Sequence, residues 1–272
     1  MRSPPAAALF ALRPLRAALV GAPALAGWAW AGGDRLSLAQ AGVLAAGAWA
    51  LAMAAFAWND RADLDRGIAG LHPSAAVRAL PGASGRWLLL LGSVAALTGV
   101  ACWTALGPLP GCLAVGVATS GWIYSDPSVF GKGRPAAAGA LHLLGGAANA
   151  GAGAWVGGST LLTTLIWAGA CGGLFVAAHR VHLAADREAD RRAGVHTSAT
   201  GISADGAARG ARSWLACVSA ALVVAGLGLG DGRGAGLAAW GMLTALFVGI
   251  AAPRGAFDAG QWRRFQGHSR LA

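Results

Sequence analysis

The sequence has few charged residues, and this scarcity excludes an ordinary soluble domain. Only 12% of its 272 residues are charged, whereas soluble domains carry roughly 25%, and 56% are hydrophobic. Its four cysteines lie in apolar segments without the paired spacing of a metal site, so they predict small buried side chains. No basic patch is interleaved with aromatic residues, so the net charge of +10 does not indicate a surface that binds nucleic acid.

Long apolar runs recur along the whole chain and predict an all-α, polytopic transmembrane helical bundle. We expect eight spans, at residues 14–33, 37–58, 86–105, 107–124, 136–157, 159–181, 212–230 and 235–252. Residues 1–252 would then form a single membrane domain. Residues 253–272 would form a short basic tail at the cytoplasmic membrane surface.

Basic residues fall almost entirely on one side of this predicted bundle. Nineteen of the 21 lie in the N-terminus, the tail and the connections after the second, fourth and sixth spans; only Arg35 and Arg233 fall on the other side. Because positive residues are retained in the cytoplasm, this predicts an integral cell-membrane protein with both termini cytoplasmic.

Two acid-rich segments end long apolar runs on that same predicted face. The first contains Asn59, Asp60 and Asp63, and the second contains Asp186 and Asp190. On a helix, Asn59 and Asp63 share a face, as do Asp186 and Asp190. Carboxylates at a membrane boundary mark a functional site, and these five residues are candidate ligands for Mg²⁺, which in turn would hold a diphosphate. Four nearby cations are candidates to neutralise the phosphates: Arg78, Lys132, Arg134 and Arg191.

These segments together resemble the UbiA-type intramembrane prenyltransferase superfamily. Asn59, Asp60 and Asp63 match its first signature, N-D-x-x-D-x-x-x-D. Its second signature, D-x-x-x-D-x-x-x-G-x-x-T, is matched by Asp186, Asp190, Gly194 and Thr197. A third element, Y-S-x-P followed by basic residues, is similar to the segment that begins at Tyr124, the only tyrosine in the chain.

The resemblance implies a helical bundle with a central cavity that opens to lipid, and a Mg²⁺-dependent enzyme. An isoprenyl group would pass from an allylic isoprenyl diphosphate to an aromatic or other lipophilic acceptor, and diphosphate would be released. The implied catalytic residues are Asp60, Asp63, Asp186, Asp190 and Tyr124. The implied substrate-binding residues are Asn59, Arg78, Lys132, Arg134, Arg191, Thr197, His142 and Asn149.

Two departures from the family pattern keep other interpretations open. The last acid of the first signature is replaced by Gly67, and Asp65, two residues earlier, points elsewhere on a regular helix. The family usually has nine spans, and eight are found here. The main alternative is a degenerate, non-catalytic paralogue that binds isoprenoid lipid or acts as a partner subunit. Two other classes of protein are disfavoured. A phospholipid head-group transferase would carry one compact acidic signature, whereas this chain has two separated ones. A transporter would show an inverted repeat of interrupted helices, and the sequence shows no such repeat.

Several polar residues inside the spans have both a structural and a functional interpretation. His142 either lines the cavity or binds a neighbouring helix, and Asn149 either joins helices or orients an acceptor. His179 and His182 are interpreted as interfacial residues beside Arg180, because Mg²⁺ prefers oxygen ligands to imidazole. His196, within the second signature, is a further candidate for substrate contact.

Overall fold

In the part of the chain that it describes, the structure is entirely helical, which confirms the predicted fold class. This computed structural model describes residues 12–32, 37–66, 84–126, 128–129, 131–192, 194, 197–229 and positions 232, 236, 239, 241 and 242. The elements are α2 (Pro14–Gly32), α3 (Leu38–Asp65), α5 (Gly85–Thr104), α6 (Pro108–Ser125), the short 3-10 turn η4 (Gly131–Gly133), α7 (Pro135–Val156), α8 (Leu161–Arg192) and α9 (Ala204–Leu229).

Each of the first seven predicted spans coincides with most of one of these helices, whereas most of the eighth lies outside the described residues. Four of the described helices contain stretches that are long and apolar enough to cross a membrane: Leu38–Asp65, Gly85–Thr104, Leu161–Leu183 and Asp205–Leu227. Three helices extend further than predicted, because α3 continues to Asp65, α8 continues to Arg192 and α9 begins at Ala204. Both acid-rich segments are therefore helical, as their spacing required.

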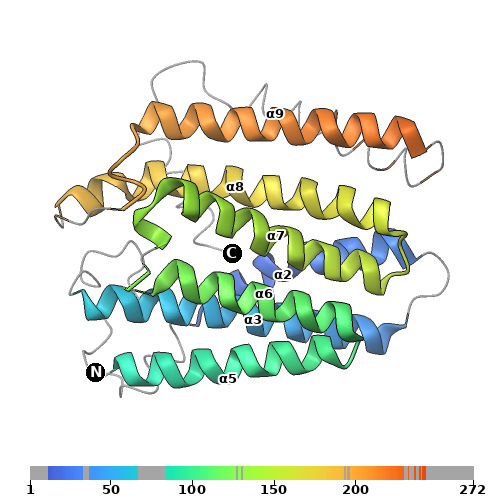
Figure 1. The fold of residues 1–272 in the computed structure, drawn as a ribbon, viewed down its shortest axis with the longest axis horizontal. Helices are drawn as coiled ribbons and strands as arrows, with labels where there is room; N and C mark the ends of the chain where they lie inside the picture. Colours follow the sequence, from blue (N-terminus) through green and yellow to red (C-terminus); the bar gives the residue numbers. More distant parts are fainter. Residues whose placement is uncertain are drawn as a thin grey trace.

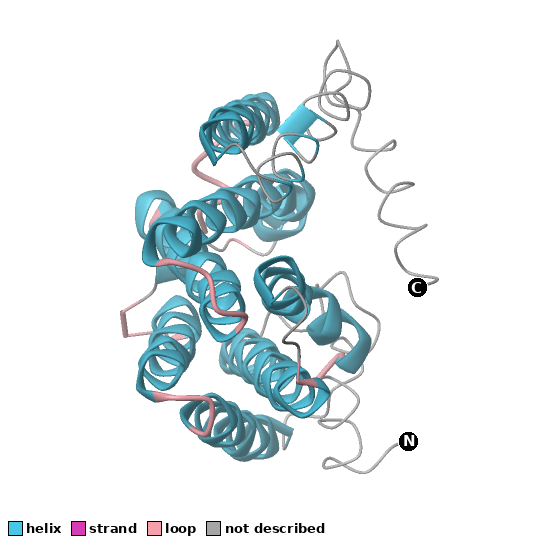
Figure 2. Ribbon diagram, turned by 90° about the vertical axis from the view of Figure 1, so that its right-hand side faces the viewer, coloured by secondary structure: helices cyan, strands magenta, loops and turns pink. Residues whose placement is uncertain are grey.

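The helices lie side by side (Figures 1 and 2). Four of them form a closed ring of contacts. In the ring, α2 packs on α3, α3 on α6, α6 on α7, and α7 on α2. Outside it, α5 covers α3 and α6, while α8 covers α7 and α9 covers α8. The acid-rich ends of α3 and α8 lie at the same end of the bundle as the starts of α2, α5, α7 and α9 (Figure 1). We call this the acid end.

Glycine and alanine bring the helix backbones close together. A Cβ atom added to Gly153 on α7 would overlap the carbonyl oxygen of Ala24 on α2, and one added to Gly146 would lie 2.6 Å from the Phe175 ring of α8. Polar side chains bind backbone atoms across these contacts, as the Asn149 amide does when it donates to the Val20 carbonyl at 2.8 Å. Small residues at such contacts are typical of membrane bundles, where close van der Waals packing holds helices together.

Helix starts follow ordinary local chemistry. Pro108 and Pro135 occupy the first turns of α6 and α7, where a missing backbone N–H leaves no hydrogen bond unmade. The hydroxyl of Ser37 accepts a hydrogen bond from the Gln40 N–H and caps α3. The start of α7 at Pro135 places Lys132, in η4, at the acid end.

Candidate functional site

Two carboxylates on the last turns of α3 are buried at the acid end. Asp60 is 0% exposed and Asp63 is 3% exposed. Buried carboxylates need partners, and each of these has one cation. Asp60 pairs with Arg13, and Asp63 Oδ1 lies 3.1 Å from Lys132 Nζ. Asn59 donates weakly to Asp63 Oδ2, at 3.5 Å, so Asn59, Asp63 and Lys132 form one connected polar group.

Arg13 is a site residue that sequence analysis missed. It directly precedes α2, and its backbone has a φ of 51°, which is uncommon for a residue with a side chain. Its carbonyl accepts a hydrogen bond from the Ala17 N–H at 2.9 Å, and its guanidinium lies 5.3 Å from the centre of the Phe56 ring. In the sequence Arg13 is only one more basic residue on the predicted cytoplasmic side, because its partner Asp60 is 47 positions away.

Lys132 links the two acidic motifs. Its ammonium group contacts Asp63, while its carbonyl oxygen accepts from both the N–H and the hydroxyl of Ser198, at 2.9 and 2.7 Å. Burial lowers the pKa of Lys132, but attraction to Asp63, Tyr124 and Asp190 outweighs burial and raises this pKa above its ordinary value. The side chain is therefore a firmly charged cation between the ends of α3, α6 and α8.

The second motif is described through Asp190 and Thr197. The Thr197 hydroxyl donates to Asp190 Oδ2, and Thr197 also accepts from the Ala199 N–H at 3.2 Å. Burial raises the pKa of Asp190, as does Asp63, while the Thr197 hydrogen bond and Lys132 act in the opposite direction. Lys132 contacts Asp63 and binds Ser198 next to Thr197, so the described residues of the two motifs lie near each other. The backbone of Asp186 belongs to α8, and its side chain lies outside the described part.

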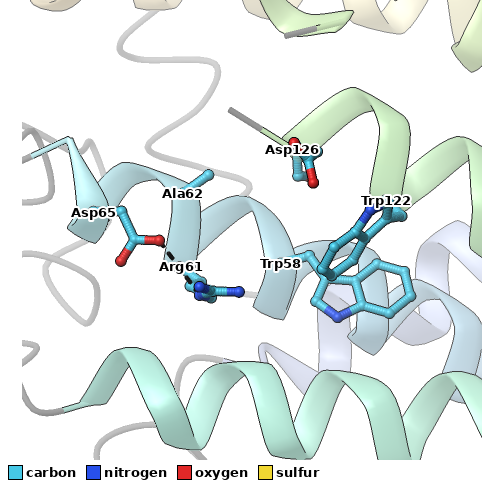
Figure 3. A pocket seen from close by; sticks show the side chains of 7 residues that line it. Trp58, Arg61, Ala62, Asp65, Trp122 and Asp126 are labelled. Carbon is cyan, nitrogen blue, oxygen red and sulfur yellow. Dashed lines mark ion pairs between the residues drawn. The ribbon is translucent and has the colours of Figure 1, made fainter. Parts of the chain in front are cut away.

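Asp65 does not take the place of the missing fourth acid. It pairs with Arg61 at 3.4 Å and lines a small pocket between α3 and α6, in which Trp58 and Trp122 meet edge to face (Figure 3). Asp60 and Asp63 are not among the residues that line this pocket. The expectation that Asp65 points elsewhere on the helix therefore agrees with the geometry.

The remaining predicted residues are distributed between the site, the surface and undescribed segments. Arg134 and Arg191 are exposed near the acid end. Asn149 is buried, and its amide joins α7 to α2 while its Oδ1 atom has no partner in the described part. Arg78, Gly67 and His196 lie outside the described residues.

Three rings from three helices form a second cluster. Tyr124 of α6 meets the His142 ring of α7 edge to face, with centroids 5.0 Å apart. His142 in turn stacks on His179 of α8 with centroids 3.9 Å apart and an interplanar angle of 15°. His179 is 4% exposed, so its interpretation as an interfacial residue was wrong. We call these three residues the imidazole cluster.

The chemistry of the donors at the acid end fits a divalent metal ion. Asp60, Asp63 and Asp190 supply hard oxygen ligands, and Asp60 Oδ2 is buried without a hydrogen-bond partner in the described part. Among the described side chains, no three acids, histidines or cysteines form a ready-made metal cluster. Arg13 and Lys132 instead provide the positive charge beside these acids. The Asp186 side chain is not among those described.

Comparison with known proteins identifies a family and several structural neighbours. A profile of the UbiA prenyltransferase family matches residues 20–266. A UbiA homologue from Archaeoglobus fulgidus bound to GPP and Mg²⁺ is 18% identical, with a TM-score of 0.76, over 97% of this chain and 96% of that one. A UbiA homologue from the same organism bound to DMAPP and Mg²⁺ is 18% identical, with a TM-score of 0.77, over 90% of this chain and 85% of that one.

A structure from a second organism shows the same fold. The apo UbiA homologue from Aeropyrum pernix K1 is 20% identical with a TM-score of 0.64, over 88% of this chain and 89% of that one. A comparison with curated proteins gives no match. At these identities the solved structures show a shared fold, and the family assignment rests on the profile match over most of the chain.

Proposed function

The chain belongs to the UbiA prenyltransferase family, and from this premise we propose that it transfers an isoprenyl group from an allylic isoprenyl diphosphate to a lipophilic acceptor. The observation that carries the proposal is the position of Lys132. Its side chain binds Asp63 of the first motif, and its backbone binds Ser198 beside the second. A diphosphate at this point would lie between the two acidic motifs.

We propose Mg²⁺ as the cofactor, held by Asn59, Asp60, Asp63, Asp186 and Asp190. The orphaned Asp60 Oδ2 atom and the hard-oxygen donor set support this choice. When bound, the metal would neutralise the negative charge that develops on the diphosphate as it leaves.

The chain's own residues would do the rest of the work. Arg13 and Lys132 are fixed cations at a largely buried site, so they would stabilise charge on the leaving diphosphate without reorganising. Thr197 would hold Asp190 in one orientation through its donated hydrogen bond. Tyr124, which influences Lys132 electrostatically, would lie where the diphosphate joins the allylic carbon. Arg78, Arg134 and Arg191 remain proposed contacts at the rim.

The same geometry supports a membrane location and orientation. We propose a multi-pass protein of the cell membrane in which residues 1–252 form one domain and 253–272 a basic tail. The described helix ends that flank the Arg-rich connections lie together at the acid end (Figure 1). Both termini would then face the cytoplasm, and the site would open toward it.

The runner-up function is a non-catalytic binder of isoprenoid diphosphate. It is favoured by one observation: Asp60 and Asp63 already have cationic partners in Arg13 and Lys132. Such a protein would bind the donor without cleaving it. Gly67→Asp would restore the family's acidic pattern, so in this case the variant would gain diphosphate release that the wild type lacks.

Purified protein tests the enzymatic proposal directly. With geranyl diphosphate as the probe, we expect diphosphate release that requires Mg²⁺ and stops with EDTA. Asp63→Asn should lower the rate by about 10²–10³-fold, the cost of losing one preorganised electrostatic contact. Asp65→Asn is the matched control, because Asp65 is paired with Arg61 and should change the rate only slightly. Equal losses in the two variants would show that the acid face of α3 has been misassigned.

A further inference from the structure

The ion pair between Arg13 and Asp60 is held in place by the residues on either side of Arg13. Leu12 packs against a cluster of buried side chains from α3 and α5. The carbonyl oxygen of Pro14 accepts a hydrogen bond at 2.7 Å from the indole N–H of Trp49 on α3. The Arg13 side chain is 12% exposed and the Asp60 side chain is 0% exposed, so the pair is largely shielded from solvent. These contacts fix the backbone of Arg13 against α3, with its side chain aimed at Asp60.

Each member of this pair keeps one polar atom without a partner. Arg13 Nη2 contacts Asp60 Oδ1. Arg13 Nε and Asp60 Oδ2 are both buried and have no hydrogen-bond partner in the described part of the chain. Buried polar atoms in native proteins are rarely left unpaired, so two of them in one ion pair call for a functional explanation. Since Nε shares a carbon with Nη2, and Oδ2 shares one with Oδ1, both atoms lie close to the contact between the two side chains.

The two free atoms attract ligands of opposite charge. Asp60 Oδ2 is a hard oxygen that suits a divalent cation, and the Nε–H group of Arg13 suits a phosphate oxygen. Each side chain also repels the ligand of its neighbour: the guanidinium repels a metal ion at Asp60, and the carboxylate repels a phosphate at Arg13. These forces act at short range and with little screening in a buried site. A metal ion that already carries a diphosphate presents both charges together and would meet both atoms.

We propose that the Arg13–Asp60 pair makes the binding of metal and the binding of diphosphate interdependent, because it accepts the two as one complex and disfavours either one alone. This inference rests on the proposed function, which places a metal ion and a diphosphate at the acid end. The sequence adds to the effect. The first motif has Gly67 where the family carries a further acid, so one guanidinium offsets a larger share of its negative charge. The protein then holds little metal without the donor and little donor without metal.

Two substitutions should each strengthen the binding of one ligand. Arg13→Gln removes the charge that repels a metal ion, so we expect the donor-free variant to bind Mn²⁺, the metal probe, about tenfold more tightly than wild type. Asp60→Asn removes the charge that repels a phosphate, so we expect about tenfold tighter binding of inorganic diphosphate in the presence of EDTA. Electron paramagnetic resonance measures free Mn²⁺, and equilibrium dialysis with labelled diphosphate measures the second affinity. A pair that only stabilises the fold would give no gain in either experiment.

The dependence of one ligand on the other is measured as the ratio of diphosphate affinity with Mg²⁺ to diphosphate affinity with EDTA. Formation of the Mg²⁺–diphosphate complex in solution is the same for every protein, so it cancels in a comparison with wild type. We expect this ratio to be about tenfold smaller in each single variant. The double variant Arg13→Gln/Asp60→Asn leaves neither charge of the pair stranded and should show the same fall. Arg61→Gln is the matched control and should keep the wild-type ratio, because Arg61 follows Asp60 directly but pairs with Asp65 and has a side chain that is 34% exposed.

Two results would overturn the interdependence of the two ligands. One is that Arg13→Gln gains no affinity for Mn²⁺ and Asp60→Asn gains none for diphosphate. The other is that the double variant keeps the wild-type ratio, a measurement that is decisive even if the single variants fail to fold. The proposed function is judged separately, by the release of diphosphate from geranyl diphosphate. A wild-type protein that binds the Mg²⁺–diphosphate complex but releases no diphosphate would be the non-catalytic binder described above, while the ratios would still decide this inference.

Discussion

Replacement of Lys132 by methionine should separate the structural role of this residue from its chemical role. The change keeps an unbranched side chain and removes the ammonium group that lies 3.1 Å from Asp63. Loss of one partner of a buried ion pair costs about 3–5 kcal/mol because the other charge is left uncompensated. The Lys132 side chain is 18% exposed and that of Asp63 is 4% exposed, so we expect the lower end, about 3 kcal/mol.

The double variant Lys132→Met/Asp63→Asn gives the decisive comparison. Asp63→Asn removes the stranded charge, so the double variant should be little less stable than Asp63→Asn alone in thermal unfolding in a fixed detergent. Diphosphate release should not recover, because both the cation and the carboxylate are absent. Arg134→Met is the matched control, since Arg134 is exposed two residues away and forms no ion pair among those found in the described residues.

The pH dependence of the stabilisation that Lys132 provides to the fold follows from its raised pKa. A lysine with a raised folded-state pKa stabilises the fold fully below its ordinary pKa of about 10.4, and this stabilisation is lost as pH rises through the folded value. The stability difference between wild type and Lys132→Met should therefore stay constant from about pH 7 to 9. Two results would refute the bridging role of Lys132. One is that the losses of unfolding free energy in Lys132→Met and Asp63→Asn simply add in the double variant. The other is that Arg134→Met lowers the stability as much as Lys132→Met does.

Three further predictions follow from other contacts. Thr197→Val removes the hydrogen bond to Asp190 and should lower the rate of diphosphate release by about tenfold, while Thr197→Ser should retain activity. Equal rates of diphosphate release in the two variants would contradict the positioning role of Thr197. Arg13→Met leaves the fully buried Asp60 unpaired and should lower the free energy of unfolding by about 3–5 kcal/mol, and Arg13→Met/Asp60→Asn should recover part of this loss. Gly153→Ala should destabilise the bundle by about 1–3 kcal/mol in thermal unfolding, because the added methyl group meets the Ala24 carbonyl, whereas Gly145→Ala adds it to open space and should be neutral.

The fold class and the position of both motifs could be predicted from sequence because they depend on local patterns. Apolar runs identify helices, in which every backbone group is paired inside the lipid bilayer. The spacing of Asn59 and Asp63, and of Asp186 and Asp190, places each pair of side chains on one helical face. The helix ends were less predictable. Apolar runs stop before the charged turns of α3 and α8, yet Arg61 is a good helix former and pairs with Asp65 at the i,i+4 spacing, which supports a further turn of α3.

Partners that are distant in sequence could not be predicted in the same way. The pairing of Arg13 with Asp60 depends on how α2 packs against α3, and a lone arginine near a span is explained equally well by topology. His179 was assigned to the interface beside Arg180 because Mg²⁺ prefers oxygen ligands to imidazole. The direction of its ring is set instead by the close contact of α8 with α7, where Gly146 admits Phe175. Neither packing contact leaves a periodic signal in the chain.

The double attachment of Lys132 has a consequence for the thermodynamics of ligand binding. Its carbonyl oxygen is bound to Ser198 and its ammonium group to Asp63, so Lys132 holds the end of α3 and the segment that begins at Thr197 in place before any ligand arrives. Ordering a loop upon association consumes part of the interaction free energy, and here that entropy is lost during folding instead. A ligand that touches both motifs therefore meets a receptor of fixed geometry, and its affinity reflects its own contacts. Replacement of Ser198 by alanine would return that entropic cost to the binding step, and calorimetry would record it as a less favourable binding entropy.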